Sequence, residues 1–242
     1  MDITWLDPHD GTAAFPNVED ALQNPEGLLA AGGDLSTNRL LNAYRQGIFP
    51  WYEDGQPILW WSPNPRGVMH TDKFKISASL RKALRKHQWT VTFDGNFKKT
   101  VIACAAPRNY ARGTWITNEM TESYTALHQQ GYAHSVELWN YRKHLIGGIY
   151  GVLIGKMFFG ESMFSFETNA SKIALAYLVT HLHHWGFPLL DCQLPSAHLA
   201  SLGAEAVTRA DYINAMTPLC NQQLNNFKWK LDETLDVPNW KP

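Results

Sequence analysis

Two acidic residues in the second half of the chain lie within apolar sequence. Glu161 follows Met-Phe-Phe-Gly at residues 157–160, and Asp191 follows Pro-Leu-Leu at residues 188–190. A carboxylate that is buried among apolar side chains loses its hydration, so such a position is costly unless a partner compensates. Proteins often retain such groups at functional sites. Two structural acids, each hydrogen-bonded to the backbone, would give the same pattern, and the acids alone leave both interpretations open.

The spacing of Asp191 and Gln193 indicates how these residues could act on an amine. Residues 189–193 are predicted to form a strand, which places Asp191 and Gln193 on one face. We expect Asp191 to accept a hydrogen bond from the Gln193 side-chain amide, while the Gln193 carbonyl accepts one from an incoming amine. On the preceding strand, Glu161 is expected to share a face with Phe159 and Met163. Such a site would work by positioning the nucleophile and by weak proton acceptance.

Other catalytic arrangements find little support in the sequence. There is no Gly-x-Ser-x-Gly motif, no Walker sequence and no Gly-x-Gly-x-x-Gly motif. Cys192 is a lone cysteine in a strand, and such residues usually belong to the core. The cluster of His181, His183 and His184 is more simply explained by water-exposed imidazoles at a helix C-terminus than by a metal site. We therefore predict no metal and no cofactor, and the substrate must arrive already activated.

Hydrophobic periodicity and turn residues predict an α+β fold. Residues 145–154 and 157–164 read as a hairpin joined by Gly-Lys, and residues 89–93 and 134–139 read as further strands. A helix is expected from about Asn169, a good capping residue, to Gly186. Further helices are expected at residues 37–47, after Ser77 up to about residue 87, and after Thr208. The first 65 residues are rich in turn signals, which predicts a small N-terminal domain at 1–65 and a larger domain at 66–242.

Composition and charge define the general class of protein. With 242 residues, 45% hydrophobic and 18% charged, the chain is typical of soluble globular proteins. The three cysteines are far apart and form no zinc spacing, which suits a reducing compartment. No signal peptide and no membrane-spanning run is visible, so we expect a cytoplasmic protein with no membrane partner.

A basic segment indicates a binding surface for a polyanion. The chain has a net charge of −1, yet residues 67–112 contain 10 basic and 2 acidic residues. The predicted helix after Ser77 would place Lys82, Arg85 and Lys86 opposite its apolar face, as phosphate binding requires. A solvated basic helix face would look the same. Trp51, Trp60 and Trp61 could form a stacking platform for a nucleobase or an apolar cluster that seals two domains.

Nine short motifs occur in one order along nearly the whole chain. They are Gly-Gly-Asp-Leu-Ser at 32, Gly-Ile-Phe-Pro-Trp at 47, Trp-Trp-Ser-Pro-Asn-Pro-Arg at 60, Gly-Thr-Trp-Ile-Thr at 113, Ala-His-Ser-Val-Glu at 133, Gly-Glu-Ser-Met-Phe-Ser at 160, Asn-Ala-Ser-Lys at 169, Asp-Cys-Gln at 191 and Ala-Ser-Leu-Gly at 200. Together they resemble the leucyl/phenylalanyl-tRNA–protein transferase family of bacteria. Each motif is weak alone, but nine collinear ones are hard to obtain otherwise.

The resemblance implies a fold and an activity. It implies a small N-terminal domain followed by a GNAT-like acyltransferase domain with a mixed, mostly antiparallel sheet. The family transfers Leu, Phe and, less well, Met from aminoacyl-tRNA to the α-amine of proteins that begin with Arg or Lys, which marks them for degradation under the N-end rule. The implied partners are therefore Leu-tRNA, Phe-tRNA and such proteins. Because the aminoacyl ester is already activated, no nucleotide-binding loop is required.

The resemblance also implies roles for individual residues. Asp191 and Gln193 correspond to the relay that activates the amine, and Glu161 corresponds to the carboxylate that holds the substrate. Trp51, Trp115 and Tyr44 correspond to the site of the terminal adenosine. The tRNA acceptor stem would contact Lys82, Arg85 and Lys86. The pocket for the aminoacyl side chain would be lined by Ile149, Phe158, Met163, Leu175, Leu178 and Leu190.

Two other functions compete with this interpretation. An acyl-CoA-dependent N-acyltransferase of the same fold would need a Gly-rich pyrophosphate loop, whereas residues 165–169 before the long helix contain no glycine. A non-catalytic RNA-binding protein could use the basic helix and the tryptophans, but it would leave Glu161, Asp191 and Gln193 without a role.

Overall fold

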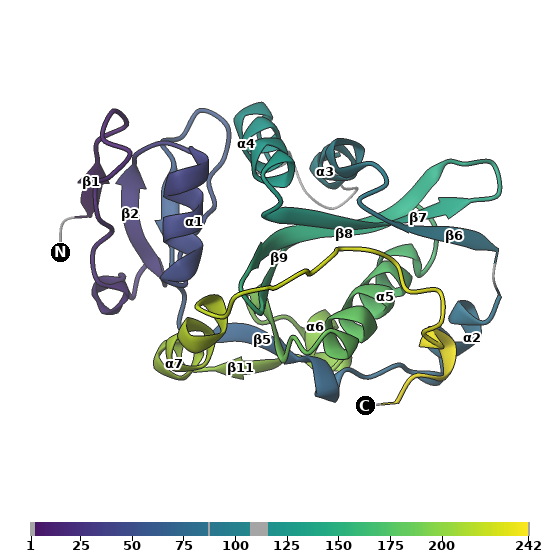
Figure 1. Cartoon of the computed structure of the whole chain (residues 1–242). Helices are drawn as coiled ribbons and strands as arrows, with labels where there is room; N and C mark the ends of the chain where they lie inside the picture. The colour runs from purple at the N-terminus through teal and green to yellow at the C-terminus, as the bar shows by residue number, and fades with distance from the viewer. Residues whose placement is uncertain (1–2, 87, 107–115, 242) are drawn as a thin grey trace.

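The strands of this computed structural model, which describes residues 3–86, 88–106 and 116–241, form two sheets (Figure 1). The smaller sheet has the order β1-β2-β4-β3, with β1 parallel to β2 and the other pairs antiparallel. Its strands are β1 (Thr4–Leu6), β2 (Leu28–Gly32), β3 (Phe49–Pro50) and β4 (Leu59–Trp61). Helix α1 (Thr37–Arg45) packs beside this sheet and faces the larger one.

The larger sheet has seven strands in the order β11-β5-β10-β9-β8-β7-β6. Only the central pair β9–β10 is parallel, and every other neighbouring pair is antiparallel. The strands are β5 (Arg66–His70), β6 (Trp89–Phe93), β7 (Ala133–Asn140), β8 (Leu145–Ile154), β9 (Met157–Ser165), β10 (Leu189–Gln193) and β11 (Glu205–Val207). The predicted α+β class with a mixed, mostly antiparallel sheet is confirmed.

Helices cover both faces of the larger sheet. Helices α3 and α4 lie on one face and α5 lies on the other, where the C-terminal segment also crosses the sheet (Figure 1). The helices of the larger unit are α2 (Ala78–Leu84), α3 (Phe97–Ala105), α4 (Asn118–Gln129), α5 (Ala170–His184), α6 (Ala197–Ser201) and α7 (Arg209–Cys220). Among the described residues, no helix has the length and apolar character that crossing a bilayer requires.

The apolar core forms two clusters, one on each face of the larger sheet. The cluster under α3 and α4 also contains Leu40 and Trp60 from the N-terminal part, packed together with Tyr150 and Tyr212. The cluster under α5 contains the apolar stripe of that helix. The last residue of β4 in the smaller sheet is Trp61, and β5 of the larger sheet begins at Arg66. The same apolar cluster contains residues of both sheets, so the core is continuous across them. A domain boundary at residue 65 therefore stays a prediction.

Local signals account for the helix ends, with one exception. Ser36 caps α1 by accepting a hydrogen bond from Arg39 N at 3.3 Å, and Gly47 follows the helix with φ +73°. Ser77 and Thr208 cap α2 and α7 in the same way. Asn169 does precede α5, but it has φ +68° and its side chain makes no capping hydrogen bond. The prediction of a side-chain cap there was wrong.

Two irregularities in the sheet decide how the site is built. The register between β8 and β9 shifts so that Glu161 has no partner, and the register between β10 and β5 shifts at Cys192. These are β-bulges, which redirect side chains locally. Because of the first bulge, Met163 packs with the α5 cluster whereas Phe159 belongs to the opposite one. The prediction that both share a face with Glu161 was therefore wrong.

Candidate active site

Asp191 is completely buried at the last paired position between β10 and β9. Its Oδ1 accepts hydrogen bonds from Arg66 Nε and from the Gln193 backbone N–H, both at 2.9 Å. Its Oδ2 accepts from Arg66 Nη2 at 2.6 Å and from the Tyr212 hydroxyl at 2.9 Å. Both oxygens therefore hold two partners each, and the charge is neutralised by a bidentate ion pair.

Arg66 is the partner that makes a buried Asp191 tolerable. The guanidinium lies over the rings of Phe49 and Tyr212, 4.8 and 4.5 Å from their centroids, and Nη1 donates to Gly47 O at 2.9 Å. Burial lowers the pKa of Arg66, but the charge of Asp191 outweighs it, so the pKa stays above its ordinary value. This residue was missed by the sequence analysis, although it ends the Trp-Trp-Ser-Pro-Asn-Pro-Arg motif.

Gln193 connects the buried ion pair to Glu161. Its backbone has φ +62°, a left-handed conformation that costs energy for a residue with a side chain. The backbone N–H donates to Asp191, while the side-chain Nε2 donates to Glu161 Oε1 at 2.9 Å. The prediction that the Gln193 side-chain amide donates to Asp191 was therefore wrong. The bulge at Cys192 turns the Gln193 side chain toward β9, which regular alternation could not indicate.

Glu161 is buried, with 8% of its surface exposed. Its Oε2 accepts a hydrogen bond from the Tyr124 hydroxyl at 2.7 Å, and the Tyr44 hydroxyl lies 2.5 Å from that of Tyr124. Burial raises the pKa of Glu161 to about 7, although the hydrogen bonds from Tyr124 and Tyr44 lower it. This carboxyl group is therefore ionised in part near neutral pH, which suits a group that takes up and returns a proton.

Glycine makes the bulge at Glu161 sterically accessible. A Cβ on Gly151, opposite the bulge, would lie 2.2 Å from Phe159 O and 2.5 Å from a ring carbon of Phe158. No other residue fits there without displacing β9. The position of the Glu161 carboxylate thus depends in part on a glycine of the neighbouring strand β8.

The residues predicted to line the aminoacyl pocket belong to one apolar cluster under α5. Five of them are buried, and the sixth, Met163, is half-buried and packed against the others. The five are Ile149, Phe158, Leu175, Leu178 and Leu190. Phe158 also stacks on Trp229 of the C-terminal segment, with ring centroids 5.5 Å apart and an interplanar angle of 11°. Sequence reasoning missed Trp229, because nothing local places the C-terminal segment on this face.

Comparison with known proteins identifies the family. The family profile described as leucyl/phenylalanyl-tRNA protein transferase matches residues 68–217, and that of its N-terminal domain matches residues 33–64. The chain belongs to this family. The resemblance drawn from the nine motifs is thereby confirmed, as is the predicted enzyme class, an aminoacyltransferase. The competing class of non-catalytic RNA-binding proteins is not supported.

Curated leucyl/phenylalanyl-tRNA–protein transferases resemble the chain over most of its length. The enzyme of Pseudomonas fluorescens (strain Pf-5) is 55% identical over 212 residues, which cover 88% of this chain and 92% of that protein. The enzyme of Pseudomonas aeruginosa (strain PAO1) is 55% identical over 210 residues, which cover 87% and 92%. The predicted activity, transfer of an amino acid from tRNA to a protein, is supported by both.

Two solved structures align with part of the chain at low sequence identity. FemX aligns with a TM-score of 0.47 at 11% identity, over 71% of this chain and 66% of its own. A GCN5-related N-acetyltransferase from Kribbella flavida aligns with a TM-score of 0.36 at 8% identity, over 68% and 58%.

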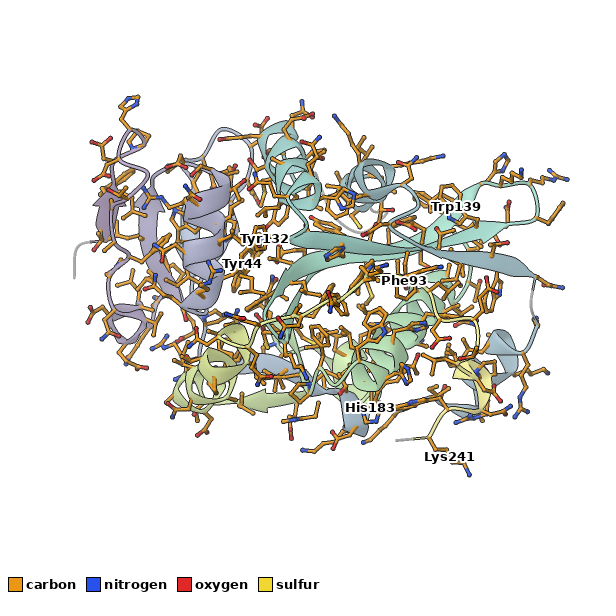
Figure 2. The ribbon with its side chains drawn as sticks, in the orientation of Figure 1. Tyr44, Phe93, Tyr132, Trp139, His183 and Lys241 are labelled. Atoms are coloured by element: carbon orange, nitrogen blue, oxygen red, sulfur yellow. The ribbon has the colours of Figure 1, made fainter. Side chains whose placement is uncertain are left out.

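The aromatic residues predicted to hold the terminal adenosine differ in exposure. Trp51 is 40% exposed and its ring lies 5.6 Å from that of Trp61. Tyr44 is fully buried on the side of α1 that faces the larger sheet (Figure 2), against the ring of Phe159. A stacking role for Tyr44 would require that its ring become exposed. Trp115 lies outside the described residues, so the adenosine site stays a prediction.

The predicted phosphate-binding residues lie on and just beyond α2. Lys82, Arg85 and Lys86 are all exposed, and their role stays a prediction. Arg85 Nη2 donates to Asn239 Oδ1 at 2.7 Å, so a phosphate would have to replace that partner. The neighbouring Arg81 is bound to the Pro238 carbonyl of the C-terminal segment.

The histidines at the end of α5 have structural partners. His181 is fully buried, its Nδ1 lies 2.7 Å from Tyr177 O, and its Nε2 accepts from Asp232 N at 3.0 Å. The expectation that this imidazole is exposed to water was wrong. Burial lowers the pKa of His181, so it stays neutral and joins the C-terminal segment to the helix.

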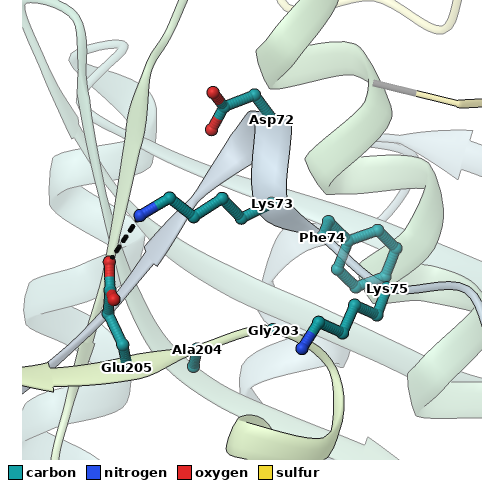
Figure 3. A pocket seen from close by; sticks show the side chains of 7 residues that line it. All are labelled: Asp72, Lys73, Phe74, Lys75, Gly203, Ala204 and Glu205. Carbon is teal, nitrogen blue, oxygen red and sulfur yellow. Dashed lines mark hydrogen bonds and ion pairs between the residues drawn. The ribbon is translucent and has the colours of Figure 1, made fainter.

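Two further features lie apart from the predicted site residues. A pocket of about 460 Å³ is lined by residues 72–75 and 203–205, with Lys73 paired to Glu205 at 3.0 Å (Figure 3). Elsewhere Asp94, His128 and His134 bring one potential ligand atom each within 4.8 Å of one another. His134 Nδ1 is hydrogen-bonded to Asp94, and His128 Nδ1 is hydrogen-bonded to the backbone carbonyl of Ala133, so both imidazoles already have a partner. Neither feature contributes to the site.

Proposed function

We propose that this chain transfers Leu, Phe and, less well, Met from aminoacyl-tRNA to the α-amine of proteins that begin with Arg or Lys, and so marks them for degradation. The observation that carries the proposal is the 2.9 Å hydrogen bond between Gln193 and Glu161, beside the end of β9–β10 pairing. It places an amide carbonyl and a titratable carboxyl group together. Together the two groups can orient an amine nucleophile and accept its proton.

The chemistry demands little beyond positioning. An N-terminal amine has a pKa near ~7.7–8.0, so a useful fraction is neutral at pH ~7. The aminoacyl ester is the activated donor, and the amine attacks its carbonyl carbon. Asp191 fixes the Gln193 backbone and Glu161 fixes its side-chain amide nitrogen, so the side-chain carbonyl oxygen is the atom that would accept from the amine.

The donor side chain would enter the apolar cluster under α5. Ile149, Met163 and Leu178 come from β8, β9 and α5, and none of the six predicted residues is polar. An apolar side chain such as that of Leu, Phe or Met gains about 25 cal/mol per Å² of apolar surface buried there. Met163 supplies a flexible side chain that adapts to donors of different shape. Leu, Phe and Met are the donors expected on these grounds.

A cytoplasmic location is part of the proposal. Aminoacyl-tRNA and the proteins that this enzyme would modify occur together in the cytoplasm. The three cysteines are free, as expected in a reducing compartment.

Binding of tRNA should depend on the basic end of α2. Replacing Lys82, Arg85 and Lys86 together by alanine should reduce the slope of log affinity against log salt by about two to three, since each phosphate contact contributes ~0.7–0.9. Fluorescence anisotropy with labelled tRNA over a range of salt concentrations measures the slope.

The matched control removes three exposed positive charges from other elements. Lys98 lies on α3, and Arg142 and Lys143 lie between β7 and β8. Their joint replacement by alanine should change the slope by less than one. If the slope of log affinity against log salt falls by the same amount in both triple variants, the salt dependence reflects net charge and not a tRNA site on α2.

A transfer assay with a panel of donors and acceptors tests the proposed function. Wild-type protein should move labelled Phe and Leu from tRNA to a protein that begins with Arg or Lys, and not to one that begins with Ala. It should leave acetyl-CoA unused. Binding of charged tRNA without label transfer, or transfer from acetyl-CoA, would contradict the proposal.

A further inference from the structure

Both oxygens of Asp191 are fully occupied by hydrogen-bond donors. Arg66 donates twice to it, and Gln193 N–H and Tyr212 O–H fill the remaining positions on its two oxygens. The carboxylate is 0% exposed, and the Arg66 side chain is 1% exposed. Asp191 therefore has no oxygen position left over for a substrate group, and its bidentate ion pair with Arg66 holds it in place.

Glu161 stands in a different environment. The groups that face it are Tyr44 from α1, Tyr124 from α4, Tyr150 from β8, Asp191 from β10 and Arg66 from β5. Within the described residues it forms no ion pair. Its donors are neutral: Gln193 lies at 2.9 Å from Oε1 and Tyr124 at 2.7 Å from Oε2, and the Tyr44 hydroxyl is a third hydrogen-bond donor. A carboxylate oxygen accepts more than one hydrogen bond, so capacity for a proton remains.

We infer that Glu161 is the group that takes the proton of the attacking amine and returns it to the leaving ribose oxygen, and that Arg66, Asp191 and Tyr212 are positioning residues. The inference rests on the proposed function. In the first step the amine nitrogen forms a bond to the ester carbonyl carbon, the C=O π pair moves to the carbonyl oxygen, and the amine proton passes to the Glu161 carboxylate. In the second step the carbonyl re-forms, the bond from this carbon to the ribose oxygen breaks, and that oxygen takes the proton from Glu161. The carboxylate is regenerated, and no co-reactant is needed.

The tyrosines support this role of Glu161. Burial, reinforced by the charge of Glu161, raises the pKa of Tyr44, Tyr124 and Tyr150 well above the usual range, so all three remain neutral. Neutral phenols stabilise the carboxylate without removing its ability to bind a proton. A group with a pKa near the working pH serves as base and then as acid in one cycle, and Glu161 meets that condition.

Two Tyr→Phe variants separate the roles of Glu161 and Asp191. Y124F removes the hydrogen bond to Glu161, and Y212F removes one hydrogen bond to Asp191. Loss of a hydrogen bond to an ionised carboxylate raises its pKa. The single-turnover rate of transfer is measured against pH with saturating Phe-tRNA and an Arg-starting acceptor. The acceptor amine titrates in the same range, but it is identical for all variants, so a shift between variants belongs to the enzyme.

In Y124F the pH at which the transfer rate rises should be higher than in wild type. In Y212F that pH should be unchanged. Glu161→Gln should slow transfer by at least ~100-fold near pH ~7, as expected for loss of an acid–base group. A shift in Y212F but not in Y124F, or a Glu161→Gln rate within ~3-fold of wild type, would overturn the inference. Failure of wild-type protein to transfer at any pH would instead overturn the proposed function.

Discussion

Replacement of Arg66 by alanine should lower the free energy of unfolding by about 3–5 kcal/mol, because it leaves the buried Asp191 carboxylate without its counter-charge. The pair is bidentate at 2.9 and 2.6 Å, and both side chains are almost fully buried. Two aromatic rings that pack on the guanidinium would lose their contact as well. Urea unfolding followed by circular dichroism measures the change.

An exposed ion pair provides the control for Arg66. Lys98 Nζ lies 2.8 Å from Glu122 Oε1, with side chains 49% and 68% exposed. Lys98→Ala should cost less than about 1 kcal/mol, since solvent screens such pairs. The double variant Arg66→Met, Asp191→Leu should recover most of the lost stability while transfer stays low. A loss in Arg66→Ala as small as that in Lys98→Ala would refute the buried-pair interpretation.

Gln193→Gly should slow transfer by about 100-fold, because the amide that positions the amine is lost. The same change relieves a left-handed backbone, φ +62°, whose cost for a non-glycine residue is about 1–2 kcal/mol. In the free energy of unfolding, this relief of backbone strain offsets the loss of the hydrogen bond to Glu161. We therefore expect a free energy of unfolding within about 1 kcal/mol of wild type. Single-turnover transfer and urea unfolding on the same preparation test both parts.

Lys143 offers the matched control for Gln193. It is exposed, has φ +59°, and lies between β7 and β8. Lys143→Gly should relieve similar strain and leave transfer unchanged. If Gln193→Gly transfers as fast as Lys143→Gly, the Gln193 side chain has no part in the reaction.

Much of the secondary structure was predictable because its signals are local. Gly155-Lys156 between two apolar runs predicts the β8–β9 hairpin, whose strands end at Ile154 and begin at Met157. The cap at Ser36 and the positive φ of Gly47 likewise follow from residue type. These features depend on a few neighbouring residues and need no knowledge of the rest of the fold.

The arrangement of the site was less predictable, because it depends on bulges and distant partners. The period of two assigns Glu161 and Met163 to one face, but the bulge at Glu161 separates them. Arg66 and Asp191 are 125 residues apart, and Tyr124 reaches Glu161 from α4. No local pattern announces either contact. The residue types of the site were therefore recognisable, whereas its hydrogen bonds required the structure.

A double-variant comparison tests most directly the claim that Gln193 and Glu161 act as one unit. Single-turnover transfer of labelled Phe from Phe-tRNA to an Arg-starting protein is measured for Gln193→Gly, Glu161→Gln and the combination. If the pair acts together, the double variant should be no more than ~3-fold slower than the slower single variant. Rate losses that multiply across the two changes would show that the residues act independently, and would contradict the account.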